Sequence, residues 1–201
     1  MAMATRERLL NAAELEFFNH GTECTSLDDI ASSAGTTRGA IYGHFENKAA
    51  ILNALLVRAG IPLDPFTVSQ NHVEGQVLES LRLDLQLRLL DVITAGTKRR
   101  MYSIMHTALF SRTSCVVSPR TMFEASQNAQ RSIEFVLRNA RTNSEVHKSI
   151  DLPGESSHIH ACLTGYFHRS LLIPPLPGKE GEVASKIVDR VLQPLILSQA
   201  I

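Results

Sequence analysis

The stretch from Ser26 to Phe45 constrains this chain more than any other part of its sequence. Its twenty residues read SLDDIASSAGTTRGAIYGHF, a pattern typical of a short helix, a glycine-containing turn and a second short helix. Ser26 and Asp29 have the spacing of a capping box, and Thr37 is placed to cap the second helix. The spacing predicts two crossing helices, with the N-terminal end of the second one exposed.

The rest of the chain shows helical periodicity, and no pair of strands is evident. Leu81 to Leu89 alternates leucine with polar residues as a strand would, but its Leu, Arg and Gln content favours a helix. A further helix is expected after the cap residue Asn47. The remaining predicted helices span 5–20 (stopped by Gly21), 97–112, 118–142, 155–173 and 180–198, and the predicted connectors are 60–75, 151–154 and 174–178.

These patterns predict an all-α fold of about nine helices. We expect an N-terminal three-helix domain with the helix-turn-helix motif at 26–45, which spans residues 3–63. A larger helical domain would then span 64–201.

Composition excludes several classes of protein. The 201 residues hold 20 Lys and Arg and 20 Asp and Glu, and no apolar run reaches the roughly 18 residues of a membrane span. No signal peptide is evident, and Cys24, Cys115 and Cys162 are too few and too scattered for a disulfide framework, so we expect a cytoplasmic protein.

Catalytic and metal-binding patterns are also missing from the sequence. It has no Ser-His-Asp order, no paired carboxylates in a cleft-like context and no glycine-rich phosphate loop, so we expect neither an enzyme nor a cofactor. His158, His160, Cys162 and His168 lie close in sequence, but no carboxylate joins them at ligand spacing. Packing and hydrogen bonding are therefore favoured for them over a metal site. The basic run 98–100 is interpreted as a solvated helical turn, although it could also approach DNA or an acidic ligand.

The second helix of the motif has the residues of a DNA-reading helix. An exposed helix start can enter the major groove, where Arg38 can read a guanine and a threonine can touch a thymine methyl or a phosphate. Tyr42 and His44 fall on the same outer side. Lys48 adds a charge beside the free amides of the next helix, which is a phosphate-binding arrangement.

The charge of this region is unusual for a nucleic-acid-binding domain. Residues 1–50 contain four basic and seven acidic residues, a net charge of −3, and the remainder is +3. DNA binding would then require that Arg38 and Lys48 face the DNA while most acids face away. We expect a modest salt dependence, with specificity from Thr36, Thr37, Arg38 and Tyr42.

The stretch ATRERLLNAAELEFFNHGTECTSLDDIASSAGTTRGAIYGHFENKAAIL resembles the N-terminal domain of the TetR family of transcriptional regulators. It is most similar to the AcrR-like branch, which represses multidrug efflux operons, and differs from it at Gly43, where that branch often has tryptophan. The resemblance implies a homodimer on a near-palindromic operator. It implies DNA contacts from Thr25, Ser26, Thr36, Thr37, Arg38, Gly39, Tyr42, His44 and Lys48.

The resemblance further implies a ligand cavity among the middle helices and a dimer interface of two C-terminal helices per subunit. Methionine and aromatic side chains form adaptable apolar walls, although for any one of them a place in the plain core is favoured over a place in the pocket. The candidate pocket residues are Met101, Met105, His106, Leu109, Phe110, Phe123, Phe135, Tyr166 and Phe167. The candidate interface residues are His158, Cys162, Gly165, Ile187, Val191 and Leu195.

The expected function is that of a repressor that a small apolar or aromatic ligand releases from its operator, controlling an efflux or detoxification operon. Its partners would be operator DNA, a second copy of the chain and the effector. No interaction with a membrane is expected. A helical small-molecule-binding protein on the same scaffold, with weak or no DNA binding, is the alternative that Gly43 and the acidic domain leave open.

Overall fold

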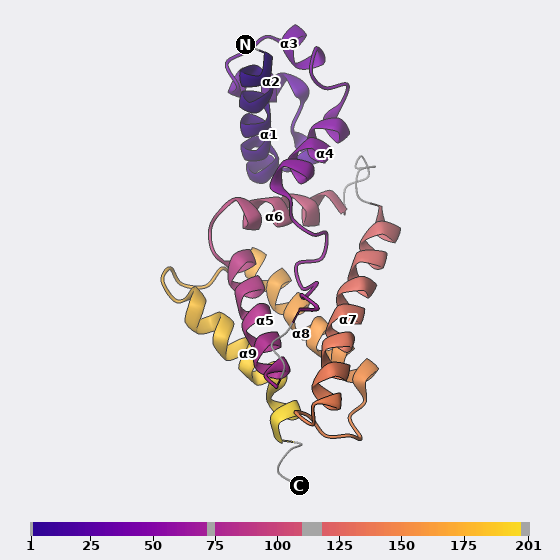
Figure 1. Cartoon of the computed structure of the whole chain (residues 1–201). Helices are drawn as coiled ribbons and strands as arrows, with labels where there is room; N and C mark the ends of the chain where they lie inside the picture. The colour runs from indigo at the N-terminus through magenta and orange to yellow at the C-terminus, as the bar shows by residue number, and fades with distance from the viewer. Residues whose placement is uncertain (1, 72–74, 110–117, 198–201) are drawn as a thin grey trace. The chain divides into compact units, whose positions relative to one another are not determined.

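The computed structural model describes residues 2–71, 75–109 and 118–197. These residues form nine helices and no strand, which confirms the predicted all-α fold (Figure 1). The helices are α1 (Ala2–Cys24), α2 (Leu27–Ser33), α3 (Arg38–Tyr42), α4 (Lys48–Ala59), α5 (Val77–Ile93), α6 (Thr97–Leu109), α7 (Pro119–Thr142), α8 (Leu152–Leu172) and α9 (Glu180–Leu197). No described helix has a stretch long and apolar enough to cross a bilayer.

The chain forms two compact units. Unit 1 comprises Met1–Ile61 and Ala95–Met122, and unit 2 comprises Pro62–Thr94 and Phe123–Ile201. Helix α6 therefore belongs to the same unit as α1 to α4, although it follows the predicted domain boundary in sequence.

Unit 1 is built on α1, which packs against α2, α4 and α6. One continuous apolar core joins these helices, because their leucine, isoleucine and phenylalanine side chains recur at helical spacing. Met101 and Ile104 of α6 belong to this core and are 1% exposed. The other large members are Leu9, Leu10, Phe17, Ile30, Ile41, Phe45, Ile51, Leu52 and Leu55.

Helix α1 does not end where the sequence predicted. Gly21 has φ 80° and ψ 158°, which interrupts the helix, but a further turn continues to Cys24. This backbone conformation is almost exclusive to glycine, so the predicted stop is a break inside the helix. The ammonium group of Lys48 donates hydrogen bonds to the carbonyl oxygens of Thr22 (2.6 Å) and Glu23 (3.2 Å) just beyond the break.

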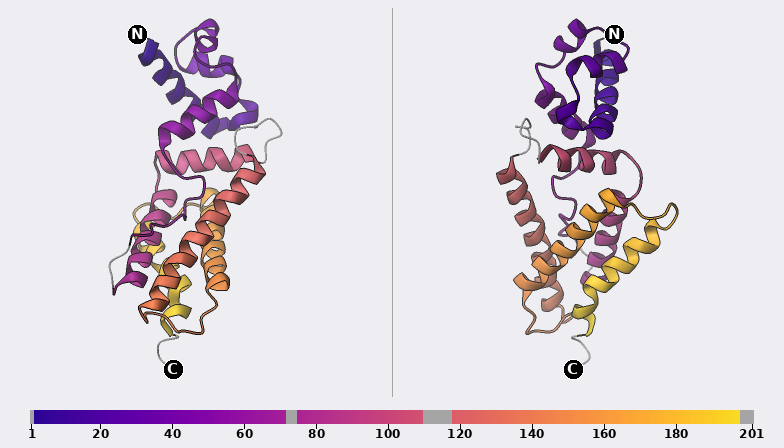
Figure 2. Two further views of the ribbon diagram at one scale, coloured as in Figure 1. Left: turned by 45° about the vertical axis from the view of Figure 1, so that its right-hand side comes forward. Right: turned by 180° about the vertical axis from the view of Figure 1, so that it is seen from behind.

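Unit 2 contains α5, α8, α9 and most of α7, with α5 packed on both α8 and α9 (Figure 2). Leu81, Leu85 and Leu89 are fully buried along one face of α5. Their spacing of four residues shows why the alternating leucines form a helix. These three of the five alternating leucines reach the core, and Leu83 and Leu87 remain exposed.

The connector after α4 is anchored in unit 2 by buried polar contacts. The carboxylate of Asp64 lies 2.8 Å from His160 Nε2 and also accepts the Phe66 N–H at 2.9 Å. The hydroxyl of Ser132 accepts the Val68 N–H at 3.0 Å. Residues 64–68 of the connector are thus held in unit 2 rather than forming a free linker.

Helix α8 begins at Leu152, so the predicted connector 151–154 is wrong for most of its length. Pro153 lies in the first turn, where a helix does not need the N–H that proline lacks. The Asp151 carboxylate lies over the same turn, and a Cβ at Gly154 would collide with it. Pro153 and Gly154, which suggested a loop, are in fact residues of a helix start.

Candidate DNA-binding site

The two helices of the motif are each started by a side-chain cap. The Ser26 hydroxyl accepts the Asp29 N–H at 3.1 Å, and the Asp29 carboxylate accepts the Ser26 N–H at 2.8 Å. These hydrogen bonds hold the pKa of Asp29 below its ordinary value. The Thr37 hydroxyl accepts the Ala40 N–H at 3.3 Å. The predicted capping box and the cap on the second helix are both confirmed.

Helix α3 has five residues, and its single buried side chain is Ile41. Phe45, just beyond the helix, is 5% exposed and belongs to the same core. With these two anchors on one side, the side chains of Thr37, Arg38 and Tyr42 lie exposed on the other. This is the arrangement that the sequence predicted for a helix that enters a groove of DNA.

The Arg38 guanidinium has two neighbours at this surface. Its Nε lies 3.1 Å from Asp28 Oδ1, and its Cζ lies 5.8 Å from the centre of the Tyr42 ring. The Tyr42 side chain and then the Asp28 charge raise the pKa of Arg38, so the group is cationic at any physiological pH. The sequence indicated that DNA binding requires most of the seven acids of residues 1–50 to face away from the DNA, and the structure places one of them, Asp28, beside the predicted reading residue Arg38.

Thr25 and Lys48 were predicted DNA contacts, and the structure shows internal bonds for both. Thr25 is 2% exposed and its hydroxyl donates to the Gly21 carbonyl oxygen at 2.8 Å. Lys48 caps the last turn of α1 through the Thr22 and Glu23 carbonyls. Lys48 thus joins the start of α4 to the end of α1, and Thr25 is held against α1 alone.

The remaining predicted contacts lie at or near the exposed surface. Ser26 and Gly39 are exposed, and Thr36 and His44 are half-buried. Gly43, the position where related sequences often carry tryptophan, has φ −69° and ψ −16°, which is ordinary helical backbone. A Cβ there would lie 3.4 Å from the Ala40 carbonyl oxygen, so the fold does not require glycine at this position.

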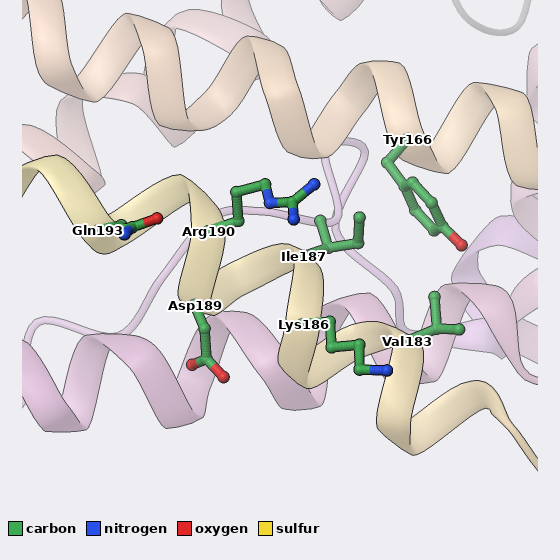
Figure 3. Close-up of a pocket in the computed structure, with 7 residues that line it drawn as sticks. All are labelled: Tyr166, Val183, Lys186, Ile187, Asp189, Arg190 and Gln193. Carbon is green, nitrogen blue, oxygen red and sulfur yellow. The ribbon is translucent and has the colours of Figure 1, made fainter.

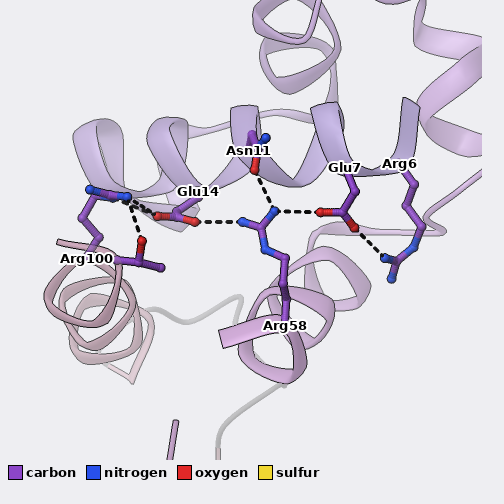
Figure 4. A network of polar contacts seen from close by, with 7 residues as sticks. Arg6, Glu7, Asn11, Glu14, Arg58 and Arg100 are labelled. Atoms are coloured by element: carbon purple, nitrogen blue, oxygen red, sulfur yellow. Dashed lines mark hydrogen bonds and ion pairs between the residues drawn. The ribbon is translucent and has the colours of Figure 1, made fainter. Parts of the chain in front are cut away.

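A buried carboxylate at the far side of unit 1 holds three helices together (Figure 4). Glu14 of α1 is 8% exposed at its side chain and lies 2.8 Å from both Arg58 of α4 and Arg100 of α6. Arg58 also donates to Asn11 Oδ1 at 2.8 Å. Arg100 was predicted to sit on a solvated basic turn, and that prediction is wrong because its guanidinium partners a buried acid.

The candidate pocket residues are divided between the two units. Met101 and Met105 of α6 are buried, and burial lowers the pKa of His106. In unit 2, Phe167 is buried and its ring lies 6.5 Å from that of Phe66. Phe123 and Phe135 are 61% and 42% exposed. Phe110 and the side chain of Leu109 lie outside the described residues.

The outer faces of α8 and α9 form an open groove in unit 2 (Figure 3). Tyr166 reaches from α8 toward α9, on the side where Val183 lies, and the other lining residues are Lys186, Ile187, Asp189, Arg190 and Gln193 of α9. Of the candidate interface residues, Ile187 lines this groove, and His158 and Gly165 are exposed on α8. Cys162 Sγ lies 3.8 Å from His158 Nε2.

Two other candidate interface residues, Val191 and Leu195, do not lie at this groove. Val191 and Leu195 are 8% and 0% exposed and belong to the buried side of α9. Among the described residues, no three His, Cys, Asp or Glu side chains converge as a metal site would require.

Two crossing capped helices on an all-helical core, with an exposed arginine and tyrosine on the second helix, define a helix-turn-helix DNA-binding protein. Residues 9–55 match the family described as bacterial regulatory proteins, tetR family. The chain is 33% identical over 202 residues to the HTH-type transcriptional regulator TtgR of Pseudomonas putida, an alignment that covers all of this chain and 95% of that protein. The chain therefore belongs to the TetR family of transcriptional regulators.

Solved structures agree with this assignment. SmeT, the repressor of a Stenotrophomonas maltophilia multidrug efflux pump, in its complex with triclosan is 27% identical with a TM-score of 0.62, covering 93% of this chain and 90% of that one. MexZ, a repressor of Pseudomonas aeruginosa, shares the fold with a TM-score of 0.76 at 24% identity, over 96% of this chain and 94% of that one.

Proposed function

We propose that this protein is a transcriptional repressor that binds operator DNA as a homodimer and controls an efflux or detoxification operon. The observation that carries the proposal is the exposed edge of α3, where Thr37, Arg38 and Tyr42 project from a helix fixed by Ile41. The match to TtgR along the whole chain supports the regulatory role. Successive major grooves, about one helical turn apart, would receive the two copies of α3.

The functional division that we propose follows the sequence. Residues 3–63 bind DNA, and residues 64–201 bind the effector and form the dimer. Helix α6 belongs to the second stretch by sequence but packs on α1 and α4 of unit 1. The open groove between α8 and α9, lined by Tyr166, Ile187 and Arg190, supports dimerisation through these helices.

The proposed effector is a small apolar or aromatic molecule. The buried aromatic ring of Phe167, which lies 6.5 Å from that of Phe66 in unit 2, supports this chemistry. The relative SmeT, solved with triclosan, supports it as well, since triclosan is an apolar aromatic compound. Effector binding would favour a conformation in which the two α3 helices no longer fit the operator.

Selection of DNA from a random pool by the purified protein tests this proposal. We expect an enriched near-palindrome with half-sites about one turn apart. A fluorescence polarisation titration of that DNA should then show release on addition of triclosan or a similar compound. Enrichment of no sequence, together with a thermal upshift by apolar compounds, would contradict the proposal and favour the small-molecule-binding alternative.

A further inference from the structure

The two adjacent acids at the start of α2, Asp28 and Asp29, have different partners. Asp29 is occupied within its own helix, because both the N–H and the hydroxyl of Ser26 donate to its carboxylate, at 2.8 and 2.7 Å. Asp28 instead reaches across the turn to α3, where its Oδ1 lies 3.1 Å from Arg38 Nε. The Asp28 side chain is 50% exposed and the Arg38 side chain 69% exposed, so this pair lies on the surface predicted to face DNA.

A carboxylate at this surface opposes phosphate binding, because it repels the DNA backbone. It also neutralises Arg38, which removes one cation from the phosphate contacts that give non-specific affinity. The pair therefore does little to strengthen general binding. Its geometry suggests another role.

The atom that Asp28 engages determines how Arg38 can be used. A guanidinium reads guanine O6 and N7 either through its two Nη groups or through Nε and one Nη. The Asp28 carboxylate approaches the guanidinium at Nε, so the Nη pair remains on the side that is open to a base. The Arg38 guanidinium lies over the Tyr42 ring, with Cζ 5.8 Å from the ring centre, which adds a cation–π attraction.

We propose that Asp28 is a positioning residue that directs the two Nη groups of Arg38 to a guanine in each operator half-site. The inference rests on the proposed function and deepens it, since it names the base that is read and the group that selects it. Asp28 would lower the general affinity for the phosphate backbone and increase the discrimination between bases.

The test uses the full-length protein and the operator selected from the random pool, with each guanine replaced in turn by 7-deazaguanine, which lacks the N7 acceptor. For the unsubstituted protein we expect one guanine per half-site at which this change weakens binding about tenfold. Arg38→Ala should be insensitive to the same replacement. In Asp28→Asn the same 7-deazaguanine replacement should weaken binding only about threefold or less. This variant should also bind random DNA more tightly. The slope of its affinity against salt concentration should become steeper by about one for each released Arg38.

Glu46→Gln is the matched control, because it removes one exposed negative charge from the same unit without touching Arg38. It should keep the full 7-deazaguanine penalty and the original salt slope. Circular dichroism of all variants checks folding. A full penalty in Asp28→Asn, or a sensitive guanine in Arg38→Ala, would overturn the inference while leaving the repressor function intact. Failure of the unsubstituted protein to select any DNA would overturn both.

Discussion

The two ends of unit 1 are stabilised in opposite ways. At the tip, formed by α2 and α3, the helices have seven and five residues, and side-chain caps start both. At the base, where α1 meets α4 and α6, a buried carboxylate and a broad apolar core join long helices. The difference teaches that the fold depends mainly on residues that DNA would not touch, and that Arg38 and Tyr42, two predicted reading residues, contribute little to the fold. The following changes test that separation.

The largest effect should come from Glu14→Ala at the base. The change leaves Arg58 and Arg100 without the carboxylate that they share. Breaking a buried ion pair is strongly destabilising, but both arginines keep some contact with solvent. We therefore expect the free energy of unfolding to fall by about 3 kcal/mol, the low end for such a change. Urea unfolding measures this loss. Arg38→Ala at the tip is the matched comparison and should change stability by less than about 0.5 kcal/mol. Equal losses in the two variants would refute the separation.

Thr37→Ala should have an intermediate effect. The change removes the hydroxyl that accepts the Ala40 N–H, and loss of such a cap destabilises by about 1 kcal/mol. Thr37→Ser retains an oxygen for the cap and should recover most of the stability. Hydrogen exchange of the α3 amides distinguishes a local loss from a global one. Unchanged exchange in Thr37→Ala would show that Ile41 alone holds the helix.

Gly43→Ala should be slightly stabilising, by about 0.4–1 kcal/mol, because the residue has helical dihedral angles and alanine restricts the unfolded chain. Gly21→Ala provides the opposite case, since φ 80° and ψ 158° strain any residue with a Cβ. Thermal unfolding should therefore rank Gly43→Ala above the original protein and Gly21→Ala below it. A decrease for Gly43→Ala would mean that the Cβ cannot be accommodated beside the Ala40 carbonyl oxygen.

The smallest effect concerns pH. Burial lowers the pKa of His106 below its ordinary value of 6.5, so the unfolded chain binds a proton before the folded one does. The stability that neutral His106 contributes is present above pH 6.5 and is lost as the pH falls toward the lowered folded value. His106→Leu should flatten this part of the stability curve. An identical acid dependence in the two proteins would assign it to other groups.

Local features of the structure were predictable from sequence. The caps at Ser26, Thr37 and Asn47 depend on residues no more than three positions away, and all three are present. The leucine pattern of 81–89 was ambiguous between helix and strand, and composition decided it correctly. Such features follow from backbone and side-chain chemistry within one or two turns.

Contacts between distant segments were not predictable. Lys48 binds carbonyls 25 and 26 residues away, and Glu14 binds Arg100 at a separation of 86 residues. Nothing local distinguishes these charges from solvated ones, and for this reason Arg100 was misjudged. The Asp28–Arg38 pair spans only ten positions, but it depends on the angle between α2 and α3, which periodicity does not define.

The single buried side chain of α3 has an evolutionary consequence. Because Ile41 is the one side chain of α3 that is committed to the core, substitutions at the exposed Arg38 and Tyr42 leave folding almost unaffected. After gene duplication, one copy can therefore acquire substitutions at these positions and change the operator sequence that it prefers, while each successive variant still folds. New regulatory circuits can diverge from this scaffold one exposed side chain at a time.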